Sequence, residues 1–233
     1  MITIICAMEQ ELKEIIKLME NIKYETFGIF KFIFGKINNI ECTAALCGVG
    51  KVNAAMCAQS LINKYRPEII LNVGVAGAID KKIKVGDIVI SDYAIEYDFD
   101  ISAFPNRKKG EISGINAVSI PCCKETSDKI LKSAKKYLKS TTIHIGTILT
   151  GDQFINSKEK LKELKDEFGG LACDMETGSI AQVCFLNKIK FVSVRSISDS
   201  ADNNSHIDFY SFLETSSKNA AIVIKEFIKS KQD

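Results

Sequence analysis

The stretch FVSVRSISDSAD (residues 191–202) joins a buried strand to a dense cluster of polar side chains. Its valines and isoleucine are typical of a strand buried on both faces, and Ser198 and Asp199 follow that strand directly. In open α/β sheets, ligands bind just beyond the carboxyl ends of such strands. The stretch therefore predicts that Asp199 lies beside a ligand. Serine and aspartate are also favoured helix caps, so a purely structural role for the pair stays open at this point.

Apolar runs rich in isoleucine and valine alternate along the chain with longer segments of helical period. This alternation is typical of a sheet with helices on both faces. No repeat or linker divides the sequence, so we expect one α/β domain over residues 1–233. The expected strands are residues 2–6, 40–47, 69–75, 88–90, 142–149 and 191–197, with a hairpin arm at 31–37. The expected helices are residues 10–19, 51–64, 126–138, 158–168, 177–187 and 211–229, and residues 102–118 are expected to form a long loop.

Charge and composition restrict the possible partners. Lysine and arginine number 31 and aspartate and glutamate 29, a formal net charge of +2 that is too weak to attract nucleic acid or an acidic membrane. No uncharged apolar run approaches the roughly 20 residues that span a bilayer, and the N-terminus lacks the features of an export signal. We therefore expect a cytoplasmic protein that binds neither nucleic acid nor membrane.

The eight cysteines include no Cys-x-x-Cys pair and are interpreted as reduced core thiols, with Cys122 and Cys123 partly exposed.

Several common catalytic patterns are incomplete in this sequence. The turn at residues 48–50 resembles the first half of a dinucleotide-binding turn, but Asn53 replaces the third glycine and no acidic residue ends the next strand. His144 and His206 are the two histidines and do not stand at metal-ligand spacing. No Gly-x-Ser-x-Gly elbow is present. These observations favour carboxylate chemistry without a metal or a cofactor.

Acidic residues stand beside predicted strands at two further places. Glu9 and Glu11 follow the first strand, where they are also consistent with helix N-terminal charges favoured by the macrodipole. Asp174 and Glu176 flank Met175 between an apolar segment and a helix. Carboxylates in such surroundings are costly unless they are paired or bind something. The second pair therefore favours a functional role over a cap.

Seven motifs stand in a fixed order along the chain: AMEQE (7–11), GVGKVNAA (48–55), NVGVAGAI (72–79), KVGDIVISD (84–92), TGDQFIN (150–156), DMETGSIAQVC (174–184) and VRSISDSAD (194–202). Together they resemble the 5'-methylthioadenosine/S-adenosylhomocysteine nucleosidases of the nucleoside phosphorylase superfamily, over essentially the whole chain. The resemblance implies a central mixed twisted sheet flanked by helices. It also implies hydrolysis of the N-glycosidic bond of both nucleosides, and of 5'-deoxyadenosine, to adenine and the 5'-substituted ribose in methionine salvage.

The resemblance implies four catalytic residues. Asp199 would deliver a proton to N7 of adenine, with Ser198 holding its carboxyl group in place. Glu11 would position and activate the attacking water, and Arg195 would lie beside that water. A proton donor near neutral pH needs a raised pKa, which we expect the apolar strand before Asp199 to supply by burial. The sugar would gain oxocarbenium character, as in glycosidases.

A substrate-binding set follows from the same resemblance. Glu176 would accept hydrogen bonds from the ribose hydroxyls, with Met175 packed against the sugar. Phe154 would stack on adenine, and backbone groups of Ile155 would bind the base edge. Ala76 and Gly77 match a turn on the substrate side. Met8, Val49 and Phe209 match apolar walls of the pocket. Ile101 and Phe104 match residues that a neighbouring subunit contributes to the 5' pocket. The last two matches imply a homodimer.

Departures from the family pattern leave alternatives open. Asp174 stands where members commonly have glutamate, and Val75 replaces a hydroxyl residue that in some members helps to hold the water. A purine nucleoside phosphorylase would attack with phosphate, which needs a cationic cradle. Of the three arginines, Arg66 and Arg107 stand at a predicted turn and in a solvated basic cluster, so only Arg195 is placed to contribute. A futalosine hydrolase-like enzyme and a nucleoside-binding protein without turnover also remain as alternatives.

Overall fold

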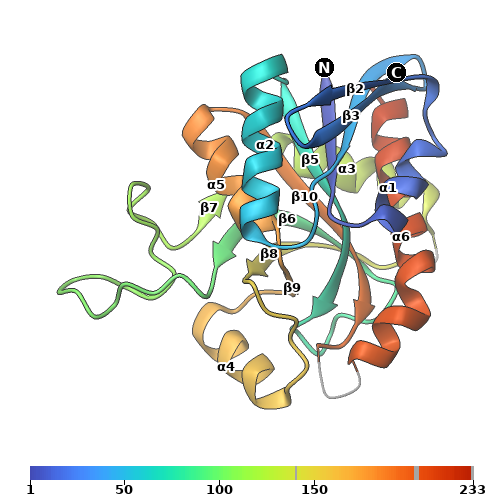
Figure 1. Ribbon diagram of the computed structural model, residues 1–233. Helices are drawn as coiled ribbons and strands as arrows, with labels where there is room; N and C mark the ends of the chain where they lie inside the picture. The colour runs from blue at the N-terminus through green and yellow to red at the C-terminus, as the bar shows by residue number, and fades with distance from the viewer. Residues whose placement is uncertain (140, 202–204, 232–233) are drawn as a thin grey trace.

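A ten-stranded mixed sheet forms the centre of the computed structural model, which describes residues 1–139, 141–201 and 205–231 (Figure 1). Its strands are β1 (Ile2–Cys6), β2 (Glu20–Phe27), β3 (Phe30–Ile37), β4 (Ile40–Leu46), β5 (Ile69–Ala78), β6 (Ile88–Glu96), β7 (Ile120–Pro121), β8 (Ile143–Thr150), β9 (Ala172–Asp174) and β10 (Lys190–Asp199). The helices are α1 (Glu9–Ile16), α2 (Lys51–Tyr65), α3 (Lys124–Tyr137), α4 (Lys158–Phe168), α5 (Thr177–Asn187) and α6 (Ser205–Lys229).

Part of the sheet closes on itself. β10 pairs in parallel with β5 on one side and antiparallel with β6 on the other. The pairs β6–β8, β8–β9 and β9–β5 complete the ring, and β1, β4, β3 and β2 extend from β5 in that order. The predicted mixed sheet is confirmed, whereas the closure was not predicted. Closure removes sheet edges and brings the ends of β5, β9 and β10 together.

Two layers of helices cover the sheet, as predicted. Successive side chains of a strand point to opposite faces, and neighbouring residues of β1 follow that rule. Ile4 packs in the core cluster that contains Ile130 of α3 and Phe227 of α6, whereas Ile5 packs in the cluster that contains Leu61 of α2. α5 packs beside α2, and α1 packs beside α6 (Figure 1). Each face of the sheet therefore has its own apolar core.

The element bounds differ from the predictions mainly at strand ends. α4 and α5 have the predicted bounds, but β2, β7 and β9 were not predicted. β2 is mostly exposed and polar, so no apolar run indicates it. β10 extends to Asp199, which therefore ends the strand instead of following it. α6 begins at Ser205 rather than at residue 211, and Asp202 lies outside the described residues.

The long loop between β6 and β7 projects from the body of the molecule (Figure 1). Two isolated bridges, Asp100 to Lys109 and Ile112 to Ala117, are the regular pairings recorded within it. The predicted loop is therefore confirmed as irregular structure. It carries Ile101 and Phe104, and Phe104 is 66% exposed.

The state of the cysteines and the polarity of the helices test two predictions made from composition. All eight cysteines are free. Cys122 is buried, contrary to the prediction that it is partly exposed, and Cys123 is half-buried. In the described part of the chain, every helix is too short or too polar to cross a membrane.

Candidate active site

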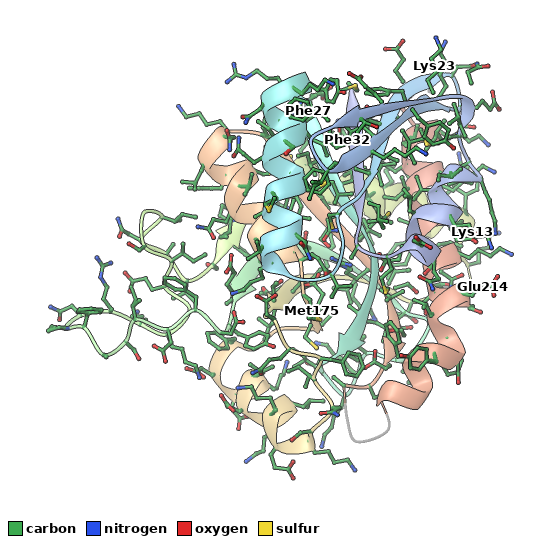
Figure 2. All side chains as sticks on the ribbon, in the orientation of Figure 1. Lys13, Lys23, Phe27, Phe32, Met175 and Glu214 are labelled. Atoms are coloured by element: carbon green, nitrogen blue, oxygen red, sulfur yellow. The ribbon has the colours of Figure 1, made fainter. Side chains whose placement is uncertain are left out.

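A cavity of about 280 Å³ lies where the carboxyl ends of six strands, β1, β4, β5, β8, β9 and β10, or the segments that follow them, converge. This is the position at which α/β sheets bind ligands. Most of the predicted site residues line it: Met8, Glu11, Val49, Ala76, Gly77, Phe154, Ile155, Met175, Glu176, Ser198, Asp199 and Phe209. Met175 lies near the start of α2 in Figure 2. Arg195, Ile101 and Phe104 do not line the cavity.

Three carboxylates from distant parts of the chain share this cavity. Glu11 lies on α1, Glu176 is the N-cap of α5, and Asp199 ends β10. Their exposed fractions are 3%, 4% and 3%. Buried carboxylates are costly unless they are bonded or serve a ligand, so the bonds of each one decide what it can do.

Glu11 is held by three backbone N–H groups. Oε2 accepts hydrogen bonds from the N–H groups of Ala7 and Met8 at 2.9 Å each, and Oε1 accepts one from Val75 at 3.0 Å. Met8 is the N-cap of α1 and Glu11 its third residue, so the side chain turns back as in a capping box. Burial raises the pKa of Glu11, although Arg195 and the three N–H groups oppose the rise. The result is a fixed and relatively basic carboxylate.

Gly74 allows Glu11 and Arg195 to approach each other. A Cβ atom at this position would overlap with Glu11 Oε1 and would lie 2.6 Å from Arg195 Nη1. Glycine is therefore required here by space. The guanidinium group lies behind the cavity wall and is fully buried, where Nη1 also donates to the Val75 carbonyl oxygen at 3.3 Å.

Arg195 forms the centre of a buried ion-pair network. Its Nη2 lies 2.6 Å from Asp174 Oδ2 and 3.5 Å from Glu176 Oε2, and it also donates to Asn72 Oδ1. Asp174 accepts further hydrogen bonds from the Thr150 hydroxyl at 2.6 Å and from the Thr177 hydroxyl. Asp174 thus has a full set of partners that joins β9 to α5. Of the carboxylate pair that flanks Met175, it is the structural member.

Glu176 lines the cavity too and has fewer protein partners than Asp174. Its Oε1 accepts the Gly50 N–H at 3.0 Å, and its Oε2 faces Arg195. Burial raises the pKa of Glu176, and the nearby charges of Asp174 and Glu11 raise it further, against the opposing effect of Arg195. Such a carboxylate is well placed to accept hydrogen bonds from a ligand.

Asp199 is oriented by its neighbours in the chain. The Ser198 hydroxyl donates to Oδ2 at 2.8 Å, and the Ala201 N–H donates to Oδ1 at 2.9 Å. The pairing of β10 with β5 is irregular between Ile197 and Asp199, a bulge of the kind that redirects a side chain. A Cβ atom at Gly77 would lie 2.9 Å from Asp199 Oδ1, so glycine leaves room for the carboxyl group.

An aromatic wall closes one side of the cavity. The rings of Phe154 and Phe209 meet edge to face, with centroids 5.7 Å apart. Phe154 remains 45% exposed, whereas Ile155 beside it is buried. A half-exposed aromatic ring at the wall of a cavity can stack on a planar base.

Other cavity residues were not in the predicted set. They are Ala7, Val75, Gln153, Cys173 and Asp174. Each lies next to a predicted residue in the chain or within two residues of one. The sequence had already singled out Val75 and Asp174 as departures from the family pattern, and proximity in the chain was the signal for the other three. Burial raises the pKa of the Cys173 thiol, which keeps it protonated.

Fold and cavity together define a member of the phosphorylase superfamily, and the model of that family matches residues 1–229. The chain is 35% identical to the 5'-methylthioadenosine/S-adenosylhomocysteine nucleosidase of Maridesulfovibrio salexigens, with 98% of both chains covered. It is similar to the crystal structure of the nucleosidase of the same name from Neisseria meningitidis in complex with methylthio-immucillin-A, with a TM-score of 0.94, 33% identity and 98% of both chains covered. It is also similar to the futalosine hydrolase of Helicobacter pylori, with a TM-score of 0.93, 30% identity, and 98% of this chain and 97% of that chain covered.

The chain therefore belongs to the 5'-methylthioadenosine/S-adenosylhomocysteine nucleosidase family. By class it is a purine nucleosidase, an N-glycosyl hydrolase. The family resemblance, the fold class and the enzyme class predicted from the sequence are confirmed.

Proposed function

We propose that this chain hydrolyses the N-glycosidic bond of 5'-methylthioadenosine and S-adenosylhomocysteine, and also of 5'-deoxyadenosine, in methionine salvage. The products are adenine and the 5'-substituted ribose. The observation that carries the proposal is the convergence of Glu11, Glu176 and Asp199 on one cavity. The eight free thiols support a cytoplasmic location, since a reducing compartment keeps thiols unpaired.

Asp199 acts on the base in the proposed mechanism. Adenine is a poor leaving group as an anion, so an acid must protonate it as the bond breaks. The hydrogen bonds from Ser198 and Ala201 fix the direction of the Asp199 carboxyl group toward the cavity. Phe154 holds the base by stacking, and the backbone of Ile155 binds its edge. The proton then passes from Asp199 to N7.

Glu11 acts on the opposite side of the sugar. A carboxylate has about four lone-pair sites, and backbone N–H groups occupy three on Glu11 among the described residues. One site on Oε1 is left for a water molecule. A pKa raised by burial makes Glu11 a stronger base toward that water as it attacks C1' of the ribose. Arg195 does not line the cavity, and in the proposed mechanism it acts through Glu11 and Glu176.

Glu176 binds the sugar itself. Its oxygens keep acceptor sites beyond the bonds from Gly50 and Arg195, and ribose hydroxyls supply the matching donors. Positive charge develops on the sugar as the glycosidic bond breaks. In its ionised form, which the neighbouring Arg195 guanidinium favours, Glu176 stabilises that transition state more than it stabilises the neutral substrate.

Adenine release in phosphate-free buffer tests the proposal. We expect methylthioadenosine, S-adenosylhomocysteine and 5'-deoxyadenosine to release adenine without added phosphate. The reason is that no lysine or arginine lies among the described residues that line the cavity, and a phosphate nucleophile needs cationic partners. Chromatography of the products against time is the measurement.

Inosine and aminofutalosine serve as comparison substrates in the same assay. Strict dependence on phosphate would identify a purine nucleoside phosphorylase instead. Faster turnover of aminofutalosine than of methylthioadenosine would identify a futalosine hydrolase-like enzyme, which the similarity to the Helicobacter pylori structure makes the relevant alternative.

The proposal includes a homodimer whose subunits complete each other's 5' pocket. Ile101 and Phe104 lie on the projecting loop and do not line the cavity of their own chain. The adjacent helices α2 and α5 carry exposed apolar side chains, which are between 44% and 68% exposed: Val52, Met56, Phe185 and Leu186. An exposed apolar surface of this kind marks a protein contact.

Substituting two of these side chains should separate the subunits. We expect Val52→Glu combined with Met56→Glu to give a monomer in sedimentation velocity, because buried, unpaired charges oppose association. The KM for methylthioadenosine should rise in the monomer, since Phe104 of the second subunit is lost from the pocket. Ile29→Glu, on a more exposed apolar residue of the β2–β3 turn, is the control and should leave the dimer intact. A wild-type monomer with full activity would contradict the proposed assembly.

A further inference from the structure

Three segments meet outside the cavity wall through a closed ring of polar contacts. The segments are the start of α2, the residues after β6 and the loop after β8 (Figure 1). Lys51 Nζ donates to Asp98 Oδ1 at 2.6 Å, and Asp98 Oδ2 accepts the Asp152 N–H at 2.8 Å. Asp152 Oδ1 then accepts the Lys51 N–H at 2.8 Å, which closes the ring. We call Lys51, Asp98 and Asp152 the polar latch.

The latch supplies a helix cap from a distant segment. Gly50 is the N-cap of α2 and has no side chain that could accept the first N–H groups of the helix. Asp152, about a hundred residues later in the chain, takes that role toward Lys51. A Cβ atom on Gly50 would lie 3.1 Å from Asp152 Oδ1, and Gly50 has a φ of +99°. Both the conformation and the approach of Asp152 therefore favour glycine at this position.

The residues beside the latch line the cavity on two walls. The Gly50 N–H, next to Lys51, donates to Glu176, and Val49 precedes it in the wall. Phe154 and Ile155 follow Asp152 by two and three residues. None of the three latch side chains lines the cavity. A change in the latch would therefore reach the ligand only through the position of these neighbours.

We propose that Asp98 and Asp152 are positioning residues for nucleoside binding, because they hold the Gly50 N–H against Glu176 and hold the loop of Phe154 over the base. This inference rests on the function proposed for the cavity. Lys51 is less suitable for a test than the two aspartates. It also pairs with the buried carboxylate of Glu96 at 3.2 Å, and its loss would leave that charge without its partner.

Substitutions of the two aspartates test the positioning role. We expect Asp152→Ala and Asp98→Ala each to raise the KM for methylthioadenosine about tenfold, the factor that corresponds to about 1.4 kcal/mol, while kcat changes much less. Asp152→Asn keeps an oxygen that accepts the Lys51 N–H, so it should restore most of the loss. Asp166→Ala is the matched control, because Asp166 is an exposed partner of Lys162 on α4 and does not line the cavity.

Hydrogen exchange of the same variants separates this inference from the proposed reaction. Both alanine variants should speed amide exchange in residues 48–55 and 150–156 and leave the core strands unchanged, since local opening follows the loss of local bonds. If the wild-type protein released no adenine, the proposed function would fail, and exchange would still decide the role of the latch. The inference would be overturned if amide exchange in both segments stayed unchanged in the alanine variants. It would also be overturned if kcat fell about tenfold in these variants while KM stayed constant.

Discussion

Replacing Asp199 by asparagine is expected to lower kcat for methylthioadenosine by at least about a hundredfold, the low end of the contribution of a general acid. Asparagine has no carboxyl proton to give to the base, whereas water attack and sugar binding depend on other residues. The affinity for adenine should change little, because the cavity keeps its shape. Single-turnover kinetics together with calorimetry of adenine binding measure the two quantities separately.

The structure explains why this variant should fold. The asparagine oxygen can accept the Ala201 N–H in place of Oδ1, and its amide group can donate to the Ser198 hydroxyl, which reverses the direction of that hydrogen bond. Ser198→Ala is the companion variant and removes the orienting hydroxyl while keeping the acid. We expect it to lower kcat less than Asp199→Asn does. Unchanged turnover in the asparagine variant would refute the role of Asp199.

The parts of the fold that the sequence predicted are those that local pattern determines. α4 has the expected bounds because its apolar residues recur with helical period between Ser157 and Gly169. α5 also has the expected bounds, although it shows little such periodicity. β9 has three residues, too few for any pattern to show. The ring closure depends on β10 pairing with β5 on one edge and β6 on the other, and such long-range pairing leaves no local signal.

The candidate site, like the fold, has parts that the sequence could predict and parts that it could not. Asp199 and Glu176 could be found because carboxylates stand beside apolar strands, and their roles came from the family resemblance. The position of Arg195 behind the wall could not be found, since it depends on Asp174, which arrives from another strand and takes up the guanidinium group. The latch was missed because Lys51 and Asp152 each looked like ordinary residues of a helix start and a loop. Only the folded chain shows that the Asp152 carboxylate accepts the Lys51 N–H.

Replacing Arg195 by methionine is expected to lower the free energy of unfolding by about 3–5 kcal/mol, the cost of breaking a buried ion pair by removing one partner. The side chain is fully buried and lies 2.6 Å from Asp174, so the substitution leaves a buried carboxylate without its countercharge. Urea unfolding followed by circular dichroism measures the change. Arg107→Met is the control: its pair with Glu111 is partly exposed, so the unfolding free energy should change much less than in Arg195→Met.

A double variant shows whether the missing countercharge is the cause. Adding Asp174→Asn to Arg195→Met removes the stranded charge. The asparagine oxygen can still accept one of the two threonine hydrogen bonds, and its amide group can donate to the other hydroxyl. The double variant should therefore be more stable than Arg195→Met alone, which is a coupling between sites in direct contact. If the two losses simply added, the stabilising role of Arg195 would lie in its bonds to Asn72 and Thr177 and not in its charge. The activity of the double variant should stay low even when its stability returns, because Glu176 has then lost the guanidinium group that fixes its Oε2.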